Sequence, residues 1–455
     1  MKNSIFQEPV FQNFVAEAPV ATAAQMIMRR LIEPNAINQI FDENAELQYE
    51  RTQMFSTITA VMASVILRQN PSVNAAHKKY AEQLGASSTA LYNKLQRIEP
   101  QTSRALVRHS HESAVEIQKA LGGVERHDVA GYQTRILDGN HLSKTEHRLK
   151  ETRSLTAGPL PGKGLAVLDP RFKTICDFVP IEDGHAQELS ELDQIIETLR
   201  AKQLWVADRN FCTLKLMYSI ATKSGCFVIR QHGKLHGEIR GKEKRVGKTE
   251  TGVVYENKLL LPEYEGEQLT VRRVVIKLNE ATRDGDMEMV ILTNLPVDDA
   301  NAVRVSELYR DRWKVETAFL HMTLHLNCEI DALCYPAASL FCFAVSAVSF
   351  NALSVLKSMF ACQHGREASE SLSHYYLCDE IAGDSRGLLI ALEDGRWEEV
   401  KEMPLDQYCA QLLAIAASIK IKRYRKSVRG PKKPSPKKKG NKNPQPGTPR
   451  GSSEN

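Results

Sequence analysis

The hydrophobic pattern of the chain changes its period near Gly131, and this change limits the folds open to it. Before Gly131, apolar residues such as Phe55, Ile58 and Val61 recur at the spacing of an amphipathic helix. After it come short β-branched or aromatic runs bounded by Gly, Pro and Asp, which are typical of strands. Helix-like stretches separate the later strands, at 186–203 and 213–224. This order predicts an α/β fold with a mixed sheet covered by helices.

The same pattern divides the chain into six predicted regions. They are a helical N-terminal domain (1–125), the first part of the sheet-bearing core (126–231), a β-rich insertion (232–300), the second part of the core with one long helix at 303–327 (301–361), a helical C-terminal region (362–419) and a basic tail (420–455). The tail is rich in Pro, Gly, Lys and Ser. Because burial cannot offset its ordering entropy, we predict that the tail is disordered.

Charge is distributed unevenly along the chain. The whole sequence has 60 Lys and Arg against 55 Asp and Glu, a net charge of +5. Residues 420–455 carry 13 Lys and Arg and one acid, a net of +12, so residues 1–419 carry the difference, −7. The sequence therefore predicts a mildly acidic body with a basic tail that binds DNA without regard to sequence.

Composition argues against a secreted or membrane protein. Nine cysteines in 455 residues, none in a C-x-x-C pair, are too dilute for a disulfide scaffold and do not indicate structural zinc. The opening MKNSIFQEPVFQNF lacks the apolar run of a signal peptide. The uncharged stretch 337–356 is long enough to span a bilayer, but its Ser and Asn residues favour a buried core helix. We expect a soluble cytoplasmic protein with no membrane partner.

Residues 74–98 have the pattern of a helix-turn-helix. Gly85 fits a tight turn, and Ser87 or Ser88 fits the cap of a second helix. Because the surrounding segment is basic, we predict that it contacts DNA, with candidate contacts at Lys78, Lys79, Lys94 and Arg97. An ordinary helical hairpin is the alternative.

Two aspartates follow apolar strand patterns. Asp138 closes the run RILD, and Asp208 closes LWVAD. If the two strands are neighbours they lie about 4.8 Å apart, and carboxylates that close repel each other unless a divalent cation lies between them. The alternative is that each Asp is only a turn residue.

The predicted long helix carries further polar residues on one face. Tyr309, Arg312 and Glu316 are spaced at i, i+3 and i+7, so they share a side of the helix. An exposed Arg312–Glu316 ion pair is the alternative, since that pair is also i, i+4. Together with the two aspartates, Glu316 completes a set of three hard oxygen ligands that suits Mg²⁺ or Mn²⁺, and two such ions can activate and cleave a phosphodiester.

These residues resemble a known family. The segments LDGNHL, VADRNFCT and YRDRWKVE, together with the basic end RYRKSVRGPKKPSPK, are similar to those of DDE transposases of bacterial insertion sequences, specifically the insertion-sequence-four-like group. The family signature Tyr-x2-Arg-x3-Glu-x6-Lys maps onto Tyr309, Arg312 and Glu316, but Thr323 stands at its Lys position. The resemblance implies a ribonuclease H-like core with a β-strand insertion, and Asp138, Asp208 and Glu316 as catalytic metal ligands.

The resemblance also implies a reaction and its partners. It implies two Mg²⁺ or Mn²⁺ ions, cleavage of double-stranded DNA at terminal inverted repeats through a DNA hairpin, and joining of the 3′-hydroxyl to target DNA by a homodimer in the bacterial cytoplasm. Arg209, Tyr309 and Arg312 look like the residues that hold the hairpin and the phosphates. Trp313 and Trp205 either contact a base or pack in the core.

Other basic and histidine residues allow more than one interpretation. The basic start of the insertion is either a solvated face or a path for flanking DNA, with candidate contacts at Arg240, Lys242 and Arg245. Four histidines are predicted to be solvated, or neighbours of ligands rather than ligands, namely His141, His147, His321 and His325.

Three other functions compete with a transposase. A structure-specific nuclease would share the core without joining DNA, and a domesticated DNA-binding protein would keep only the fold. A carbohydrate-active enzyme fits the carboxylates but not the basic segments.

Overall fold

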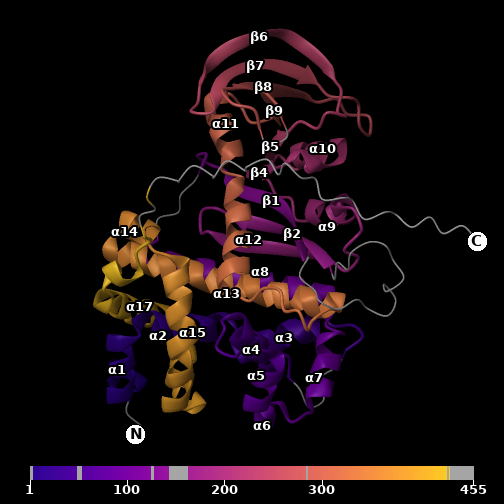
Figure 1. Cartoon of the computed structure of the whole chain (residues 1–455). Helices are drawn as coiled ribbons and strands as arrows, with labels where there is room; N and C mark the ends of the chain where they lie inside the picture. Colours follow the sequence, from indigo (N-terminus) through magenta and orange to yellow (C-terminus); the bar gives the residue numbers. More distant parts are fainter. Residues whose placement is uncertain are drawn as a thin grey trace, which may run out of the picture.

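The computed structural model of the chain describes residues 4–48, 54–123, 128–142, 162–282, 285–427 and 430. Figure 1 shows an all-helical N-terminal region below a twisted sheet, with the C-terminal helices beside them. The N-terminal helices are α1 (Pro9–Glu17), α2 (Pro19–Leu31), α3 (Pro34–Asn44), α4 (Phe55–Ile66), α5 (Val73–Lys79), α6 (Ala81–Leu84), α7 (Ser88–Leu95) and α8 (Pro100–Ala120). The predicted basic tail beyond 430 and His147 lie outside the described residues.

The sheet is mixed, as the sequence pattern predicts. Its nine strands lie in the order β3-β2-β1-β4-β5-β9-β8-β7-β6. Their bounds are β1 (Gln133–Leu142), β2 (Gly162–Asp169), β3 (Thr174–Ile181), β4 (Gln203–Ala207), β5 (Cys226–Arg230), β6 (Glu238–Lys248), β7 (Gly252–Leu260), β8 (Thr270–Leu278) and β9 (Glu288–Thr293). Strand β4 is parallel to β1 and β5, and the other pairings are antiparallel. The predicted insertion therefore extends the core sheet through β9.

Side chains of the central strands alternate between two hydrophobic cores. Ile136 and Val206 belong to the larger core, which includes side chains of α8, α12 and α13. Leu137 and Trp205 belong to the smaller core, beneath α9 (Leu192–Ile196) and α10 (Leu214–Thr222). This alternation is the period of two that strands impose, and it explains why the strand segments are apolar throughout.

Helix α13 (Pro336–His364) is the central support of the molecule. It contacts α8, α2, α4, α17 and strands β2 and β3. Its length and apolar composition would also allow it to cross a membrane, but its most apolar window is wholly buried inside the fold. The predicted core helix is confirmed. Pro336 occupies the first turn, where the missing N–H costs no hydrogen bond.

The predicted single helix 303–327 is wrong in one respect, because the structure has two helices there. These are α11 (Ala302–Arg310) and α12 (Trp313–His325), separated at Asp311 and Arg312. The N–H of Arg312 bonds the carbonyl of Tyr309, and that of Val315 bonds the carbonyl of Arg312, both at a spacing of three residues. Such bonds tighten the chain locally, which breaks the regular α-helical spacing between Tyr309 and Glu316.

Three other predicted elements differ from the structure. The helical pattern in the sequence runs from Glu46 to Gln69, but the structure places helix α4 at Phe55–Ile66. The helix expected at 186–203 is reduced to a 3₁₀ turn at Glu188–Glu191 and the short α9. Strand β6 was not predicted, because its residues lack alternating burial and nearly all are exposed.

The C-terminal region is helical, as expected. Its helices are α14 (Arg366–Glu370), α15 (His374–Ala391), α16 (Glu398–Glu402) and α17 (Leu405–Ser418). Helix α15 packs against α2, and α17 packs against α13 and α8. The C-terminal helices therefore close the N-terminal helical region around α13.

Asn351 joins α13 to the sheet and to α8. Its side chain is fully buried. The amide oxygen accepts a hydrogen bond from the N–H of Ile175 at 2.8 Å, and the amide nitrogen donates to the carbonyl of Ile175 at 3.0 Å and to Ser110 Oγ at 2.9 Å. The Asn351 side chain thus forms hydrogen bonds with both the N–H and the carbonyl of Ile175 in β3.

We expect Asn351→Ala to lower the free energy of unfolding by about 2 kcal/mol, because it leaves buried backbone groups of Ile175 without partners. Urea denaturation measures this change. The matched control is Ser346→Ala, since Ser346 is equally buried on α13 but donates to Cys342 of its own helix. An equal loss of stability in both variants would contradict the prediction.

Candidate active site

The parallel pairing of β1 with β4 places two aspartates side by side. Its register joins Leu137 to Ala207, so Asp138 and Asp208 occupy the next position on each strand. The two strands are neighbours, which was the condition for the two carboxylates to approach each other. The prediction that Asp138 ends its strand is wrong, because β1 continues to Leu142 through its pairing with β2. Only the pairing with β4 ends there.

Both aspartates face the side of the sheet that α12 covers. Asp138 lies two residues after Ile136, and Asp208 lies two residues after Val206, so each has the orientation of a residue in the larger core. Helix α12 contacts β1 on this side, and in Figure 1 it runs across the strands.

Arg312 connects two of the three predicted carboxylates. Its Nη1 donates to Asp138 Oδ2 at 2.8 Å, and its Nη2 donates to Glu316 Oε1 at 2.6 Å. Arg312 is only 8% exposed. The exposed Arg312–Glu316 pair that sequence reasoning offered as an alternative is therefore part of a partly buried network that includes Asp138.

The network changes the ionisation of Asp138. Burial raises the pKa of this carboxyl to about 7, and the charges of Asp208 and Glu316 act in the same direction. The Arg312 guanidinium and the N–H of Gly139 oppose the rise. Because Asp208 and Glu316 both raise the pKa of Asp138, the three carboxylates lie close enough to interact electrostatically.

Tyr309 lies beside the same network. It is buried on α11, and burial raises the pKa of its hydroxyl, with Asp208 adding to the rise and Arg312 and Arg230 opposing it. Arg312 has a raised pKa although burial acts against it, because Asp138, Tyr309 and Glu316 stabilise its charge. Arg230 was not singled out as a site residue, since in sequence it only begins a basic run.

The oxygen atoms of the three carboxylates suit a hard divalent cation, but the carboxylates do not lie close enough together to share one. Among the described residues, no three His, Cys, Asp or Glu side chains are close enough to share an ion. Arg312 supplies positive charge between Asp138 and Glu316 instead. Its Nε is buried and has no hydrogen-bond partner. The guanidinium therefore has an unused donor beside the carboxylates.

Asp208 is fixed by its own turn. Its Oδ1 accepts a hydrogen bond from the N–H of Asn210 at 2.6 Å, which caps the 3₁₀ turn Arg209–Phe211. Asp208 is thus a turn residue that also lies beside Asp138, and its role as an ion ligand stays a prediction. Arg209 follows it at the border of the site and is partly buried.

Gly139 is a requirement of the site that sequence reasoning passed over. A β-carbon at this position would collide with the carboxyl group of Glu188. Glu188 also lies 3.5 Å from His141 Nε2. The only signal in the sequence was the Gly that follows Asp138.

The remaining predicted residues of the core lie in different surroundings. Trp205 is 2% exposed and packs in the smaller core, whereas Trp313 is 60% exposed at the start of α12. Thr323, at the signature Lys position, is exposed near the other end of α12. His321 and His325 both stack with His374 of α15, and both are partly buried.

The predicted helix-turn-helix has the expected backbone. Helices α5 and α6 lead to Gly85 in the left-handed region at φ 57°, and Ser87 caps α7 by accepting from the N–H of Ala90. Three of the four basic candidates are exposed, namely Lys78, Lys79 and Arg97. Lys94 lies 4.4 Å from the ring centre of Phe41. DNA contact by this segment stays a prediction.

The basic residues of the insertion lie on β6, which forms one edge of the sheet. Arg240, Lys242 and Arg245 are exposed, and Arg240 pairs with Glu238 at 2.7 Å. Charged side chains on an edge strand also prevent pairing with other sheets. In Figure 1, β6 and the helices α5–α7 lie at opposite ends of the molecule, so they are separate surfaces.

The domain has an α/β core with a mixed sheet, and its carboxylate network lies under α12. Residues 130–335 match the family model described as "Transposase DDE domain". The resemblance inferred from the motifs is confirmed at that level. The insertion-sequence-four-like group stays a prediction.

Two known proteins illustrate how distant the similarities are. The transposase for insertion sequence element IS421 from Escherichia coli is 24% identical over 189 residues, which cover 33% of this chain and 50% of that protein. The chain therefore spans about half the length of the curated relatives it matches. A cryo-EM structure of the piggyBac transposase synaptic complex with hairpin DNA is 10% identical, with a TM-score of 0.41, and covers 90% of this chain and 86% of that chain.

Proposed function

We propose that this chain is the DDE transposase of an insertion sequence, which cleaves DNA at the ends of the element and joins the 3′-hydroxyl to target DNA. One observation carries the proposal. Within a domain that matches transposase DDE domains, Asp138 and Asp208 occupy equivalent positions on adjacent parallel strands, and Arg312 connects Asp138 to Glu316.

The proposed chemistry assigns each group a role. Asp138, Asp208 and Glu316 would hold two divalent ions, Mg²⁺ or Mn²⁺, and this requires Asp138 and Glu316 to exchange their bonds to Arg312 for bonds to an ion. Such ions activate the attacking oxygen and stabilise the leaving oxygen of a phosphodiester. Arg312 would then donate its fork of N–H groups to a DNA phosphate, for which a planar guanidinium is suited.

Further details of the proposal follow from the resemblance in the motifs. Arg209 and Tyr309 would hold the phosphates of a DNA hairpin intermediate, and Trp313, exposed beside the network, would contact a base. The partners would be double-stranded terminal repeats and target DNA. The active form would be a homodimer in the bacterial cytoplasm, because two ends are brought together.

Two alternative functions would give different products. A structure-specific nuclease with the same residues would release cut ends without joining them, and a domesticated DNA-binding protein would cut nothing. Hairpin intermediates and joined products, resolved on denaturing gels, separate these possibilities from a transposase.

We expect Glu316→Gln to reduce Mg²⁺-dependent cleavage of element-end DNA by about a thousandfold, because the loss of an ion ligand removes several kcal/mol of transition-state stabilisation. DNA affinity should remain within about twofold. The control is Glu307→Gln, a partly exposed glutamate on α11 that pairs with Arg304. Normal cleavage by the Glu316 variant would eliminate the proposed trio.

We expect Arg312→Gln to bind Mn²⁺ about tenfold more tightly than the unchanged protein when DNA is absent, because the guanidinium competes with ions for Asp138 and Glu316. Isothermal titration with Mn²⁺ measures the affinity. Arg310→Gln is the control, since Arg310 is exposed and pairs with Glu250 instead. Weaker Mn²⁺ binding by the Arg312 variant would show that Arg312 organises the carboxylates rather than competing for them.

We expect removal of residues 428–455 to weaken binding of any DNA duplex and to flatten its dependence on salt, because eight Lys and Arg are lost. The slope of log affinity against log salt concentration should fall by several units, as about 0.9 unit is lost per phosphate contact. Mn²⁺ binding should not change. An unchanged slope would mean that the tail has another role.

A further inference from the structure

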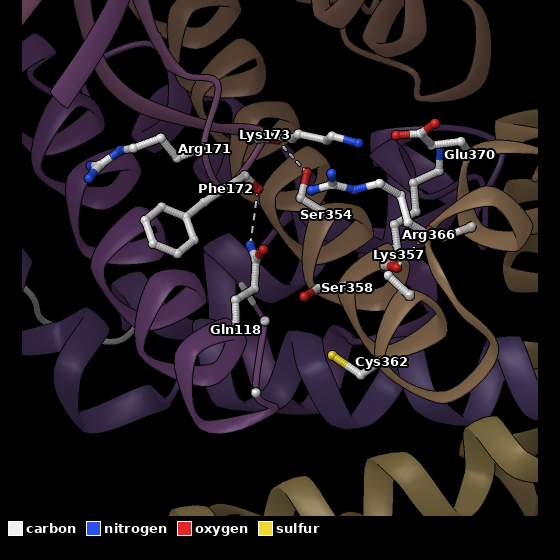
Figure 2. A pocket seen from close by; sticks show the side chains of 14 residues that line it. Gln118, Arg171, Phe172, Lys173, Ser354, Lys357, Ser358, Cys362, Arg366 and Glu370 are labelled. Atoms are coloured by element: carbon white, nitrogen blue, oxygen red, sulfur yellow. Dashed lines mark hydrogen bonds between the residues drawn. The ribbon is translucent and has the colours of Figure 1, made fainter. Parts of the chain in front are cut away.

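A cavity of about 400 Å³ lies away from the carboxylate network and shares no residue with it. Three segments that are distant in sequence form its walls, namely the end of α8 with the residues that follow it, the turn between β2 and β3, and the C-terminal half of α13 with α14. Four cationic side chains line it against one carboxylate, that of Glu370 (Figure 2). The cations are Arg171, Lys173, Lys357 and Arg366.

Ion pairing distinguishes this cavity from two others in the molecule. One of them is lined by Arg104 and Arg108, which both bond Asp177. The other is lined by Arg29 and Lys401, which pair with Asp394 and Glu398. In those cavities the four named cations are each bonded to a carboxylate of the protein.

Two cations of the first cavity lack such neutralisation. Among the residues that the structure describes, neither Lys357 nor Arg366 forms an ion pair with a carboxylate, whereas Arg171 pairs with Asp169 at 2.6 Å. Lys357 Nζ instead lies 3.3 Å from Nδ1 of His374. That ring is neutral, because burial and the Lys357 charge lower its pKa. A partly buried ammonium without an anion is costly, so the cavity lacks a negative charge.

The cationic groups are held in place by the surrounding structure. Lys173 has a left-handed backbone at φ 56°, and its carbonyl accepts a hydrogen bond from Ser354 Oγ at 2.6 Å. The preceding carbonyl, of Phe172, accepts from Gln118 Nε2 at 3.1 Å. Figure 2 shows the side chains of Lys173 and Arg366 extending toward each other above Ser354. The cations therefore face one space from different segments.

We propose that this cavity binds a phosphate group through Lys173, Lys357 and Arg366. The volume lies within the range of small-ligand pockets, and cationic donors from the β2–β3 turn, α13 and α14 suit the negatively charged oxygens of a phosphate. On the proposed function the phosphate belongs to the backbone of bound DNA, and this assignment rests on that function. A free phosphate ion offers the same chemistry and is the other source.

The charges around Lys357 make anion binding depend on pH. Burial lowers the pKa of Lys357 to about 7. The cations Lys426 and Lys173 lower it further, whereas Cys378 and Glu370 act in the opposite direction. An anion binds the protonated ammonium, so binding weakens as pH rises through this value. Between pH 6 and pH 8 the protonated fraction of a group with this pKa falls about tenfold.

The test uses the full chain with sulfate and with inorganic phosphate as probes. Sulfate keeps its charge across this pH range, so its affinity reports on the protein alone. We expect the double variant Lys357→Met, Arg366→Gln to bind both ions at least tenfold more weakly, by calorimetry at constant ionic strength. The control is Lys223→Gln, which removes an exposed lysine outside the cavity. The same affinity in the variant and the unchanged protein would overturn the proposal.

Two further measurements distinguish binding from a structural role. Lys357→Met alone should raise the melting temperature at pH 6 in the absence of anions, because it removes a charge that is partly buried. It should also abolish the tenfold effect of pH on sulfate affinity. A lower melting temperature together with unchanged sulfate binding would show that Lys357 only supports the fold, and would overturn its assignment to the site.

DNA binding identifies the source of the phosphate. With a 20-base-pair duplex, loss of affinity in the double variant and a salt slope smaller by about one unit per lost contact would support backbone phosphate. Loss of ion binding with unchanged duplex binding would support a free phosphate ion. Both measurements are independent of cleavage. A protein that binds sulfate in the cavity but never cleaves DNA would contradict the proposed function and leave the phosphate site intact.

Discussion

The parallel register between β1 and β4 is the constraint on which the site depends. A shift of one residue would turn one aspartate to the opposite face of the sheet, under α9 and α10 instead of α12. With Leu137 opposite Ala207, Asp138 and Asp208 both face α12. Extended pairing of β1 with β2 then keeps the backbone beyond Asp138 rigid. The pair is thus set by backbone hydrogen bonds rather than by a loop.

The positive charge of Arg312 offsets the repulsion between the carboxylates of the site. Asp208 and Glu316 raise the pKa of Asp138, and three carboxylates so close together would destabilise the folded protein if no positive charge lay among them. The guanidinium of Arg312 bonds Asp138 and Glu316 and is only 8% exposed. The two carboxylates in turn stabilise the buried charge of Arg312. Because its Nε has no hydrogen-bond partner, the network is not closed, and a ligand with oxygen acceptors has a donor to meet. The break between α11 and α12 falls at this residue.

Sequence reasoning succeeded where hydrophobic pattern and local chemistry agree. The strands that lead to Asp138 and Asp208 were recognised from their apolar runs, and the stretch 337–356 was predicted to be a buried core helix because of its Ser and Asn residues. It failed where distant contacts decide the outcome. The local sequence of Asp311 and Arg312 gives no reason for a helix to stop, and the exposed Ile239 and Val246 of β6 give no alternation to detect. The cavity cations Lys173, Lys357 and Arg366 come from segments that no spacing rule connects.

Net charge describes this molecule poorly, because electrostatic interactions in solution extend only about 8–10 Å at physiological salt. Residues 1–419 carry a net charge of −7, which taken alone argues against a polyanionic partner. The charges that a DNA strand would meet are local, and they differ from place to place. At β6 and at α5–α7 exposed cations are spread along the surface, whereas in the cavity the exposed Lys173 and Arg366 converge with the partly buried Lys357. A partly buried cation costs stability when empty and interacts more strongly with an anion than an exposed one. A surface of exposed cations adds affinity along any strand, whereas cations that converge on one cavity hold one phosphate at one place. The cavity is therefore suited to position a phosphate, and the exposed basic surfaces are suited only to attract one.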